Sequence, residues 1–240
     1  MTGAEPVAQA LAAVRERIRR TAEQQGRDPA SVRLVAVSKR QPVEKIRAAY
    51  AAGQRDFGEN YAQELLAKQA ALSDLSELRF HMIGGLQRNK VAGLLGHISA
   101  LHSVDSLRLI EELGRRAPAR PVPLGRRLLP GGELAVFIEV NLGAQAHKAG
   151  CEPAQLAELI AAVQALPSLS LRGLMTVPAG AGEAASARQQ FERLQELRER
   201  HGGTARLPEL SIGMSRDLEV AVACGSSWVR IGTDIFGARV

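Results

Sequence analysis

The stretch Leu34-Val35-Ala36-Val37-Ser38-Lys39 decides the fold of this chain. Its first four residues are all apolar, and two of them are valine, which predicts a strand buried on both faces. The polar turn Arg40-Gln41-Pro42 follows, and helical spacing of apolar residues begins at Val43. The order strand, loop and helix predicts an α/β unit. Lys39 then lies at the carboxyl end of a strand, where α/β proteins bind ligands.

The same alternation of strand and helix continues through the chain. Strands are predicted at 34–37, within 55–60 (a short strand and its loop), and at 78–83, 98–104, 134–140, 170–175, 209–212 and 228–231. Helices are predicted at 43–52, 61–71, 87–95, 107–116, 153–166, 183–201 and 216–224. Alternating strands and helices imply parallel strands joined by right-handed crossovers.

Eight strands in about 200 residues favour a closed (β/α)8 barrel of the TIM type. An open doubly wound sheet is the alternative, but no G-x-G-x-x-G motif follows the first strand. We therefore predict a single α/β domain over residues 1–240, with an extra N-terminal helix at 8–25. The segment 117–132, rich in proline and glycine, is predicted to be a long loop inside that domain.

The composition narrows the range of partners and compartments. A formal charge of +6 and a pI of about 9.9 raise the question of nucleic-acid binding. Only five of the 31 basic residues are lysine, and the arginines are spread among acidic residues, so we expect no nucleic-acid partner. Cys151 and Cys224 lie far apart, as is typical of free thiols in a reducing compartment. With no signal region and no membrane-spanning run, we expect a cytoplasmic protein.

Polar residues follow the last two predicted strands, which are neighbours in a barrel. The seventh strand leads into Ser211-Ile212-Gly213-Met214-Ser215, and the eighth into Arg230-Ile231-Gly232-Thr233. Either segment alone is explained by turn chemistry, with Ser215 as a helix cap. Together, glycines and hydroxyls after strands seven and eight are typical of a barrel phosphate site.

Lys39 and Arg230 indicate which chemical groups a ligand of this phosphate site has besides the phosphate. An arginine in an apolar strand needs a partner, either a carboxylate such as Glu139 or a bound group. Lys39 is either a solvated charge on a turn or an amine that forms a Schiff base with a carbonyl. A lysine, an arginine and a phosphate site at one mouth fit pyridoxal 5′-phosphate (PLP), through its aldehyde, ring nitrogen and phosphate.

Three other polar residues near strand ends have simpler explanations. His81 and His102 have no carboxylate or cysteine at metal-ligand spacing, so we expect packed, hydrogen-bonded histidines. Glu59 is expected to be an ion-pair partner in its loop rather than an acid or base. No metal site is predicted.

The chain resembles the PLP homeostasis protein family, which is related to the barrel domain of alanine racemase. The resemblance covers almost the whole chain, in family order, through Ala36-Val37-Ser38-Lys39, Phe57-Gly58-Glu59-Asn60-Tyr61, His81-Met82-Ile83-Gly84, Leu86-Gln87-Arg88-Asn89-Lys90, His102-Ser103-Val104-Asp105, Gly173-Leu174-Met175, Leu210-Ser211-Ile212-Gly213-Met214-Ser215 and Val229-Arg230-Ile231-Gly232-Thr233. Phe80 and Gly85 depart from the family pattern, where tryptophan and proline are common. Both lie outside the lysine, seventh-strand and eighth-strand motifs.

The resemblance implies a PLP carrier that takes part in intracellular PLP and amino-acid homeostasis, without established catalytic turnover. It implies that Lys39 forms the Schiff base, that Arg230 faces the pyridine nitrogen and that Asn60 lies near the ring. The implied cofactor-binding residues are Lys39, Asn60, Ser211, Met214, Ser215, Arg230, Gly232 and Thr233. PLP-dependent apo-enzymes are the implied partners, and we expect a monomer.

Two other functions stay open on the sequence. A PLP-dependent amino-acid racemase needs an acid or base on each face of the cofactor. In alanine racemase a tyrosine of a second domain serves one face, and we expect no such domain in a chain that stops just past the eighth strand. Tyr61 is then the one rival for that role. The third function is a phosphate-ligand enzyme that uses Lys39 without PLP.

Overall fold

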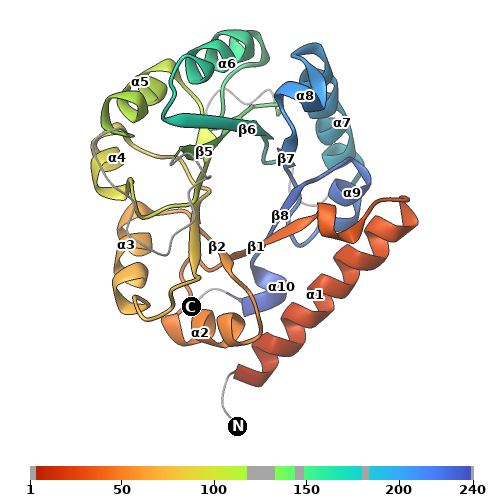
Figure 1. Cartoon of the computed structure of the whole chain (residues 1–240). Helices are drawn as coiled ribbons and strands as arrows, with labels where there is room; N and C mark the ends of the chain where they lie inside the picture. The colour runs from red at the N-terminus through yellow and green to blue at the C-terminus, as the bar shows by residue number, and fades with distance from the viewer. Residues whose placement is uncertain (1–3, 118–132, 144–148, 180–183, 239–240) are drawn as a thin grey trace.

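In the computed structural model, which describes residues 4–117, 133–143, 149–179 and 184–238, eight parallel strands close into a barrel in sequence order (Figure 1). The strands are β1 (Arg33–Val37), β2 (Asp56–Glu59), β3 (Arg79–Met82), β4 (Ala100–Val104), β5 (Leu134–Glu139), β6 (Leu169–Met175), β7 (Glu209–Ser211) and β8 (Trp228–Ile231). Pairing of β8 with β1 closes the barrel. The predicted (β/α)8 barrel is confirmed, and the open doubly wound sheet is wrong.

Helices surround the barrel (Figure 1); all but the last of them, which follows β8, connect consecutive strands. They are α2 (Val43–Ala51), α3 (Ala62–Ala71), α4 (Arg88–Leu94), α5 (Leu107–Arg116), α6 (Leu156–Gln164), α7 (Ala184–Arg200), α8 (Gly203–Arg206), α9 (Leu218–Ala223) and α10 (Thr233–Phe236). The short helices α8 and α10 were not predicted, because four residues are too few to show a hydrophobic period. Of the predicted long loop, residues 118–132 lie outside the described residues.

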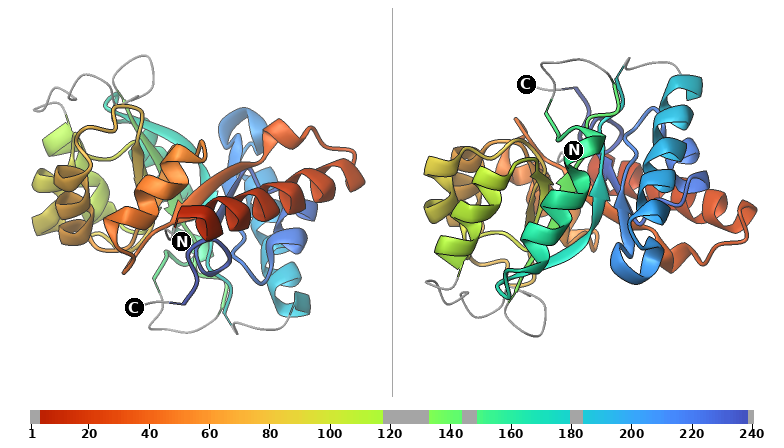
Figure 2. Two further views of the ribbon diagram at one scale, coloured as in Figure 1. Left: turned by 90° about the horizontal axis from the view of Figure 1, so that it is seen from below. Right: turned by 90° about the horizontal axis from the view of Figure 1, so that it is seen from above.

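The extra N-terminal helix is α1 (Ala4–Gln24), which lies along the side of the barrel (Figures 1 and 2). Its apolar side chains recur every three or four residues and are buried against α2, α9 and α10. Arg17 of α1 pairs with Glu219 of α9 at 2.8 Å and with Asp234 of α10 at 2.6 Å. The helix therefore covers the seam at which the first and last units meet.

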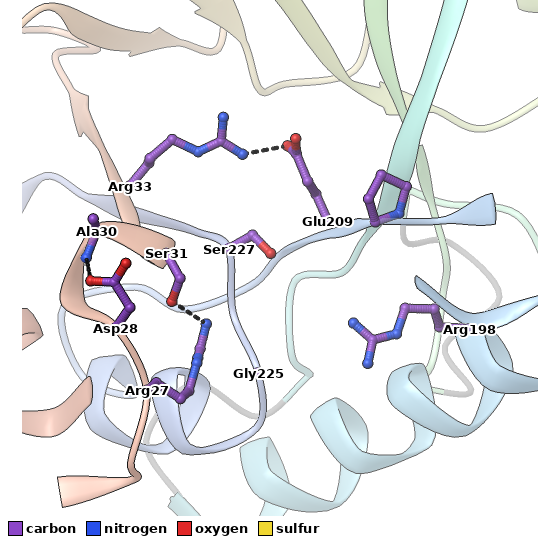
Figure 3. Close-up of a pocket in the computed structure, with 10 residues that line it drawn as sticks. Arg27, Asp28, Ala30, Ser31, Arg33, Arg198, Glu209, Gly225 and Ser227 are labelled. Carbon is purple, nitrogen blue, oxygen red and sulfur yellow. Dashed lines mark hydrogen bonds and ion pairs between the residues drawn. The ribbon is translucent and has the colours of Figure 1, made fainter. Parts of the chain in front are cut away.

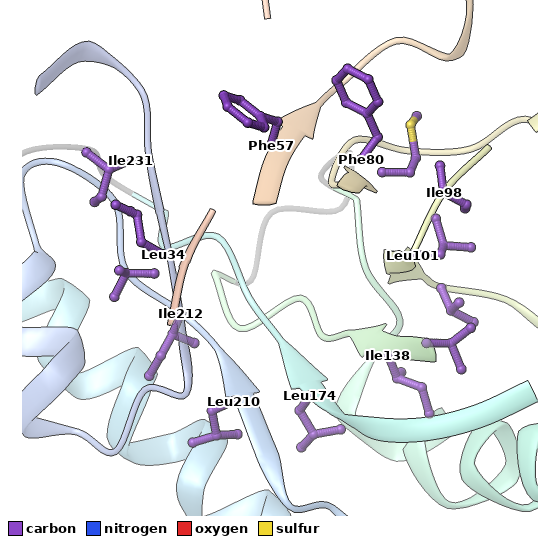
Figure 4. Close-up of a cluster of buried hydrophobic side chains, with 14 of the residues drawn as sticks. Leu34, Phe57, Phe80, Ile98, Leu101, Ile138, Leu174, Leu210, Ile212 and Ile231 are labelled. Carbon is purple, nitrogen blue, oxygen red and sulfur yellow. The ribbon is translucent and has the colours of Figure 1, made fainter. Parts of the chain in front are cut away.

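Side chains alternate along each strand, so the barrel buries two layers. The outer layer packs between strands and helices and is large, as Figure 4 shows for Phe57, Leu101 and Ile138. The inner apolar layer is a small cluster of Val35, Ala100, Phe137, Met175 and Trp228. Polar side chains occupy the rest of the interior, and this polar content bears on the site. In the described part of the chain, no helix is long and apolar enough to cross a membrane.

Candidate binding site at the mouth of the barrel

Lys39 lies in a tight turn directly after β1, at the carboxyl ends of the strands. The Gln41 N–H donates to the Ser38 carbonyl at 3.0 Å, and between them Arg40 adopts a φ of 56°. Residues other than glycine rarely adopt that backbone conformation. Backbone strain of this kind concentrates at functional sites. The Arg40 N–H donates to Glu64 Oε1 of α3 at 2.5 Å, which holds the strained turn. The backbone on both sides of the partly buried Lys39 is therefore anchored.

A cluster of ionised side chains, Lys68, Glu59 and Glu64, packs against this turn and holds its backbone. Lys68 Nζ of α3 donates to the Ser38 carbonyl at 2.6 Å, to Glu59 Oε1 at 2.8 Å and to Glu64 Oε1 at 2.7 Å. The Ser38 hydroxyl also donates to Glu59 Oε1, at 2.7 Å. Burial raises the pKa of Glu59 although Lys68 opposes it. The expected ion-pair role of Glu59 is confirmed.

Two oxygen atoms at the end of β2 offer acceptors for a bound molecule. Glu59 Oε2 and Asn60 Oδ1 are buried, and neither has a hydrogen-bond donor among the described residues. Buried polar atoms are normally satisfied, so such atoms suit a ligand. Gly84 packs directly against the Asn60 backbone, because a Cβ at position 84 would lie 2.5 Å from the Asn60 carbonyl oxygen. Asn60 was predicted from sequence, whereas the need for glycine at 84 appears only in three dimensions.

The loop after β7 lies beside strand β8, since the Arg230 N–H donates to the Gly213 carbonyl at 2.8 Å. Gly213 has a φ of 101°, and a Cβ there would lie 2.5 Å from Ala221 Cβ. Only glycine therefore fits this turn. A Cβ on Gly232 would lie 3.1 Å from the Val37 carbonyl oxygen, at the end of the strand that carries Lys39. The residues predicted for a phosphate site thus share one edge with the end of β1.

The predicted capping role of Ser215 is wrong. Asp217 is the N-cap residue of α9, and its Oδ1 accepts from the Met214 N–H at 2.5 Å. That hydrogen bond lies within the turn before the helix, and the Asp217 side chain makes no capping hydrogen bond to α9. The Ser215 carbonyl accepts from Arg17 of α1 at 3.3 Å, which fixes its backbone and leaves its hydroxyl out of the cap.

Arg230 is buried, and both of its terminal nitrogens donate hydrogen bonds within the protein. Nη1 donates to the Ser211 hydroxyl at 2.7 Å and to the Ser211 carbonyl, and Nη2 donates to the Thr176 carbonyl at 3.0 Å. Burial lowers its pKa to about 10, against the attraction of Glu139 and Asp217. The alternative of an ion pair with Glu139 is not seen among the described residues. Glu139 instead has its pKa raised to about 7 by burial.

His81 and His102 contact each other inside the barrel, with Nδ1 of the first 3.0 Å from Nε2 of the second. The expectation of packed, hydrogen-bonded histidines is confirmed. Within the part of the chain that is described, no group of three or more histidine, cysteine or acidic side chains could hold a metal ion.

A hollow of about 590 Å³ lies at the opposite end of the barrel, where β1, β7 and β8 begin (Figure 3). Arg27, Arg33, Arg198 and Glu209 are among the residues that line it. Arg33 pairs with Glu209 at 2.7 Å, and Arg27 donates to the Val222 carbonyl at 2.6 Å. These groups already have partners, and none of the predicted site residues lines the hollow. The candidate site is therefore the other end, at the mouth.

The chain is a (β/α)8 barrel with a lysine after its first strand, a buried arginine in its eighth strand and glycine turns beside them. These features are those of the barrel domain to which the matching family model refers. The model of the family described as "Alanine racemase, N-terminal domain" matches residues 9–240. The chain belongs to the pyridoxal phosphate homeostasis proteins within that family. It is 46% identical to the pyridoxal phosphate homeostasis protein of Pseudomonas aeruginosa, over 97% of this chain and 96% of that protein. The corresponding figures for the Escherichia coli K12 protein are 41%, 97% and 97%.

Solved structures give the same result. PipY of Synechococcus elongatus with PLP bound is 39% identical, with a TM-score of 0.79 over 96% of this chain and 100% of that chain. Alanine racemase from Streptomyces coelicolor has a TM-score of 0.69 at 22% identity, over 95% of this chain and 58% of that chain. The second likeness shows the fold alone. The family resemblance read from the sequence is confirmed.

Proposed function

We propose that this protein binds PLP at the mouth of the barrel and carries it as a Schiff base on Lys39, as part of intracellular PLP and amino-acid homeostasis. The observation that carries the proposal is the convergence of Lys39, Arg230 and the two glycine turns on the adjacent strands β1, β7 and β8. The PLP-bound PipY structure supports it, as do the relatives named for PLP homeostasis. PLP-dependent apo-enzymes as recipients, a monomeric state and the cytoplasm belong to the same proposal.

The geometry supports distinct roles for the proposed residues. When bound, PLP supplies an aldehyde that condenses with an amine and a ring that withdraws electrons. The Lys39 amine is the group for the aldehyde, and Asn60 offers an acceptor on the β2 side. Arg230 uses its inner donors on Ser211 and Thr176, which fixes its plane and leaves its outer N–H groups for the ring nitrogen.

The phosphate is assigned to the paired turns after β7 and β8. Gly213 and Gly232 let the backbone of these turns pack closely against Ala221 and Val37, and the hydroxyls of Ser215 and Thr233 are the proposed donors. An anion in such turns is stabilised by backbone N–H groups as well as by hydroxyls. The remaining proposed contacts on this side are Ser211 and Met214.

Ser215→Ala is expected to weaken PLP binding by about ten- to a hundred-fold without unfolding the protein. The reason is the loss of one hydrogen bond to a charged phosphate, worth about 1.5–3 kcal/mol. The PLP dissociation constant, followed by absorbance, measures the effect. Ser73→Ala, at an exposed position after α3, is the matched control. An unchanged dissociation constant in Ser215→Ala would place the phosphate elsewhere.

A carrier is distinguished from a racemase in deuterium oxide. We expect the PLP-loaded protein to be yellow and to form no D-alanine from L-alanine, with any Cα exchange retaining configuration. Lys39 can serve one face of the cofactor, and a second base is needed for inversion. Tyr61 is half exposed just before α3, and the Arg40 guanidinium lies 5.9 Å from its ring centre. Sustained D-alanine formation that is lost in Tyr61→Phe would make the protein an enzyme.

A further inference from the structure

A chain of hydrogen bonds crosses the barrel interior from the base to the mouth. It begins at Asp56, the first residue of β2, whose Oδ1 lies 3.0 Å from His81 Nε2. His81 Nδ1 lies 3.0 Å from His102 Nε2, and His102 Nδ1 lies 2.8 Å from the Ser211 hydroxyl. Arg230 Nη1 completes the chain by donating to that hydroxyl at 2.7 Å. These five residues connect the start of one strand to the proposed cofactor arginine.

The two ends of this series of hydrogen bonds have fixed and opposite roles: Arg230 is a donor and Asp56 is an acceptor. A guanidinium only donates, so the Ser211 oxygen accepts from Arg230 and the serine hydrogen is left for His102 Nδ1. At the other end Asp56 is ionised: burial opposes this, but hydrogen bonds from Arg79 and His81 hold its pKa well below the usual range. An ionised carboxylate only accepts. When the serine hydrogen is donated to His102, every group between the two ends passes its hydrogen bond in the same direction, toward Asp56.

This direction determines the tautomers of both imidazoles. His102 accepts at Nδ1 and donates from Nε2 to His81 Nδ1. His81 in turn carries its proton on Nε2 and donates it to Asp56. Burial, aided by the positive charge of Arg230, lowers the pKa of His102 well below its usual range, in agreement with a neutral ring.

Aromatic packing holds both rings in place. The His102 ring is stacked on Phe137, with centroids 4.3 Å apart and an interplanar angle of 19°. The His81 ring lies 5.0 Å from Trp228. These contacts fix the planes of both imidazole rings before any ligand binds.

We propose that His81 and His102 are positioning residues for the PLP site, which hold the Ser211 hydroxyl as an acceptor for Arg230. The inference rests on the proposed function, because the held guanidinium is the one assigned to the pyridine nitrogen. If His102 presented an N–H at Nδ1, the Ser211 oxygen would face two donors. Its own hydrogen would then have no acceptor in this series of hydrogen bonds, and Arg230 would share the hydroxyl oxygen with a second donor.

The first test reads the tautomers directly in the protein without PLP. Nitrogen-15 NMR of the five histidines is expected to show His81 and His102 neutral at pH 7, each protonated on Nε2. The variant His102→Asn assigns the signals by loss. A proton on Nδ1 of either ring, or a doubly protonated His81, would overturn the direction of the chain.

The second test measures PLP affinity in matched variants. His102→Phe keeps the stacking on Phe137 but removes both nitrogens, and PLP affinity is expected to fall about tenfold. His102→Asn, whose amide oxygen can replace Nδ1 as the acceptor, should recover part of that loss. Phe137→Leu disturbs the same packing and removes no hydrogen-bonding group, so it should lose less PLP affinity than His102→Phe.

The outcomes separate this inference from the proposed function. An equal loss of affinity in Phe137→Leu and His102→Phe would make the effect one of packing and overturn the positioning role. Unchanged affinity in His102→Phe would do the same. If the unmodified protein bound no PLP, the proposed function would fail, whereas the NMR of the same protein would still decide the direction of the chain.

Discussion

Replacing Lys39 with alanine is expected to abolish covalent retention of PLP while the barrel stays folded. Lys39 is partly buried, and Glu64 and Lys68 hold the backbone of the residues on either side of it. Removing the amine therefore removes the only group proposed to condense with the aldehyde, and the cofactor is left with non-covalent contacts alone. The fold should be unaffected, because those backbone anchors do not depend on the side chain at position 39.

Borohydride reduction followed by peptide mass mapping measures this effect. The unmodified protein should carry the reduced cofactor on the peptide that contains Lys39, and Lys39→Ala should carry none there. Lys90→Ala, at the first turn of α4, is the matched control and should keep its label. Thermal unfolding of all three proteins checks the fold. Label on Lys90 or Lys148 in the unmodified protein would contradict the assignment.

Lys68→Met is expected to lower the free energy of unfolding by about 3–5 kcal/mol, the range for breaking a buried ion pair on one side. The side chains of Lys68 and Glu59 are 7% and 0% exposed, so the remaining carboxylate would be buried without its cation. The Ser38 carbonyl would also lose its donor directly before Lys39. Urea unfolding at pH 7 measures the loss.

The pH dependence of this loss follows from the sign of the Glu59 shift. Burial already raises the pKa of Glu59, and removing Lys68 raises it further. A carboxyl group whose pKa is higher in the folded than in the unfolded protein is penalised at neutral pH and relieved as it protonates. The destabilisation of Lys68→Met should therefore shrink as the pH falls from 7 toward 5.

A double variant separates charge from packing. Lys68→Met with Glu59→Gln removes the buried charge and keeps an acceptor for the Ser38 hydroxyl. We expect it to be more stable than Lys68→Met alone. Equal stability of the two variants at pH 7 would mean that the loss comes from packing around Lys68.

The sequence by itself determined the barrel and the approximate location of the proposed site. Strand and helix periods are local properties, so the eight units appear in the order of their apolar patterns. Parallel strands present their carboxyl ends at one mouth, which is why Lys39, Arg230 and the glycine turns could be named together before the structure was known. The family motifs lie in these same segments and added the identity of the cofactor.

Only the tertiary structure decided which side chains support that mouth. Lys68 reaches the carbonyl of Ser38, 30 positions away, and nothing in an ordinary helix pattern distinguishes it from a solvated lysine. His102 and Ser211 are 109 positions apart and meet because closure of the barrel directs the inward faces of β4 and β7 to one axis. The turn before α9 is closed by Asp217 and not by Ser215, because the Asp217 carboxylate accepts from the Met214 N–H. Such contacts depend on barrel closure and loop geometry, which no local pattern of residues encodes.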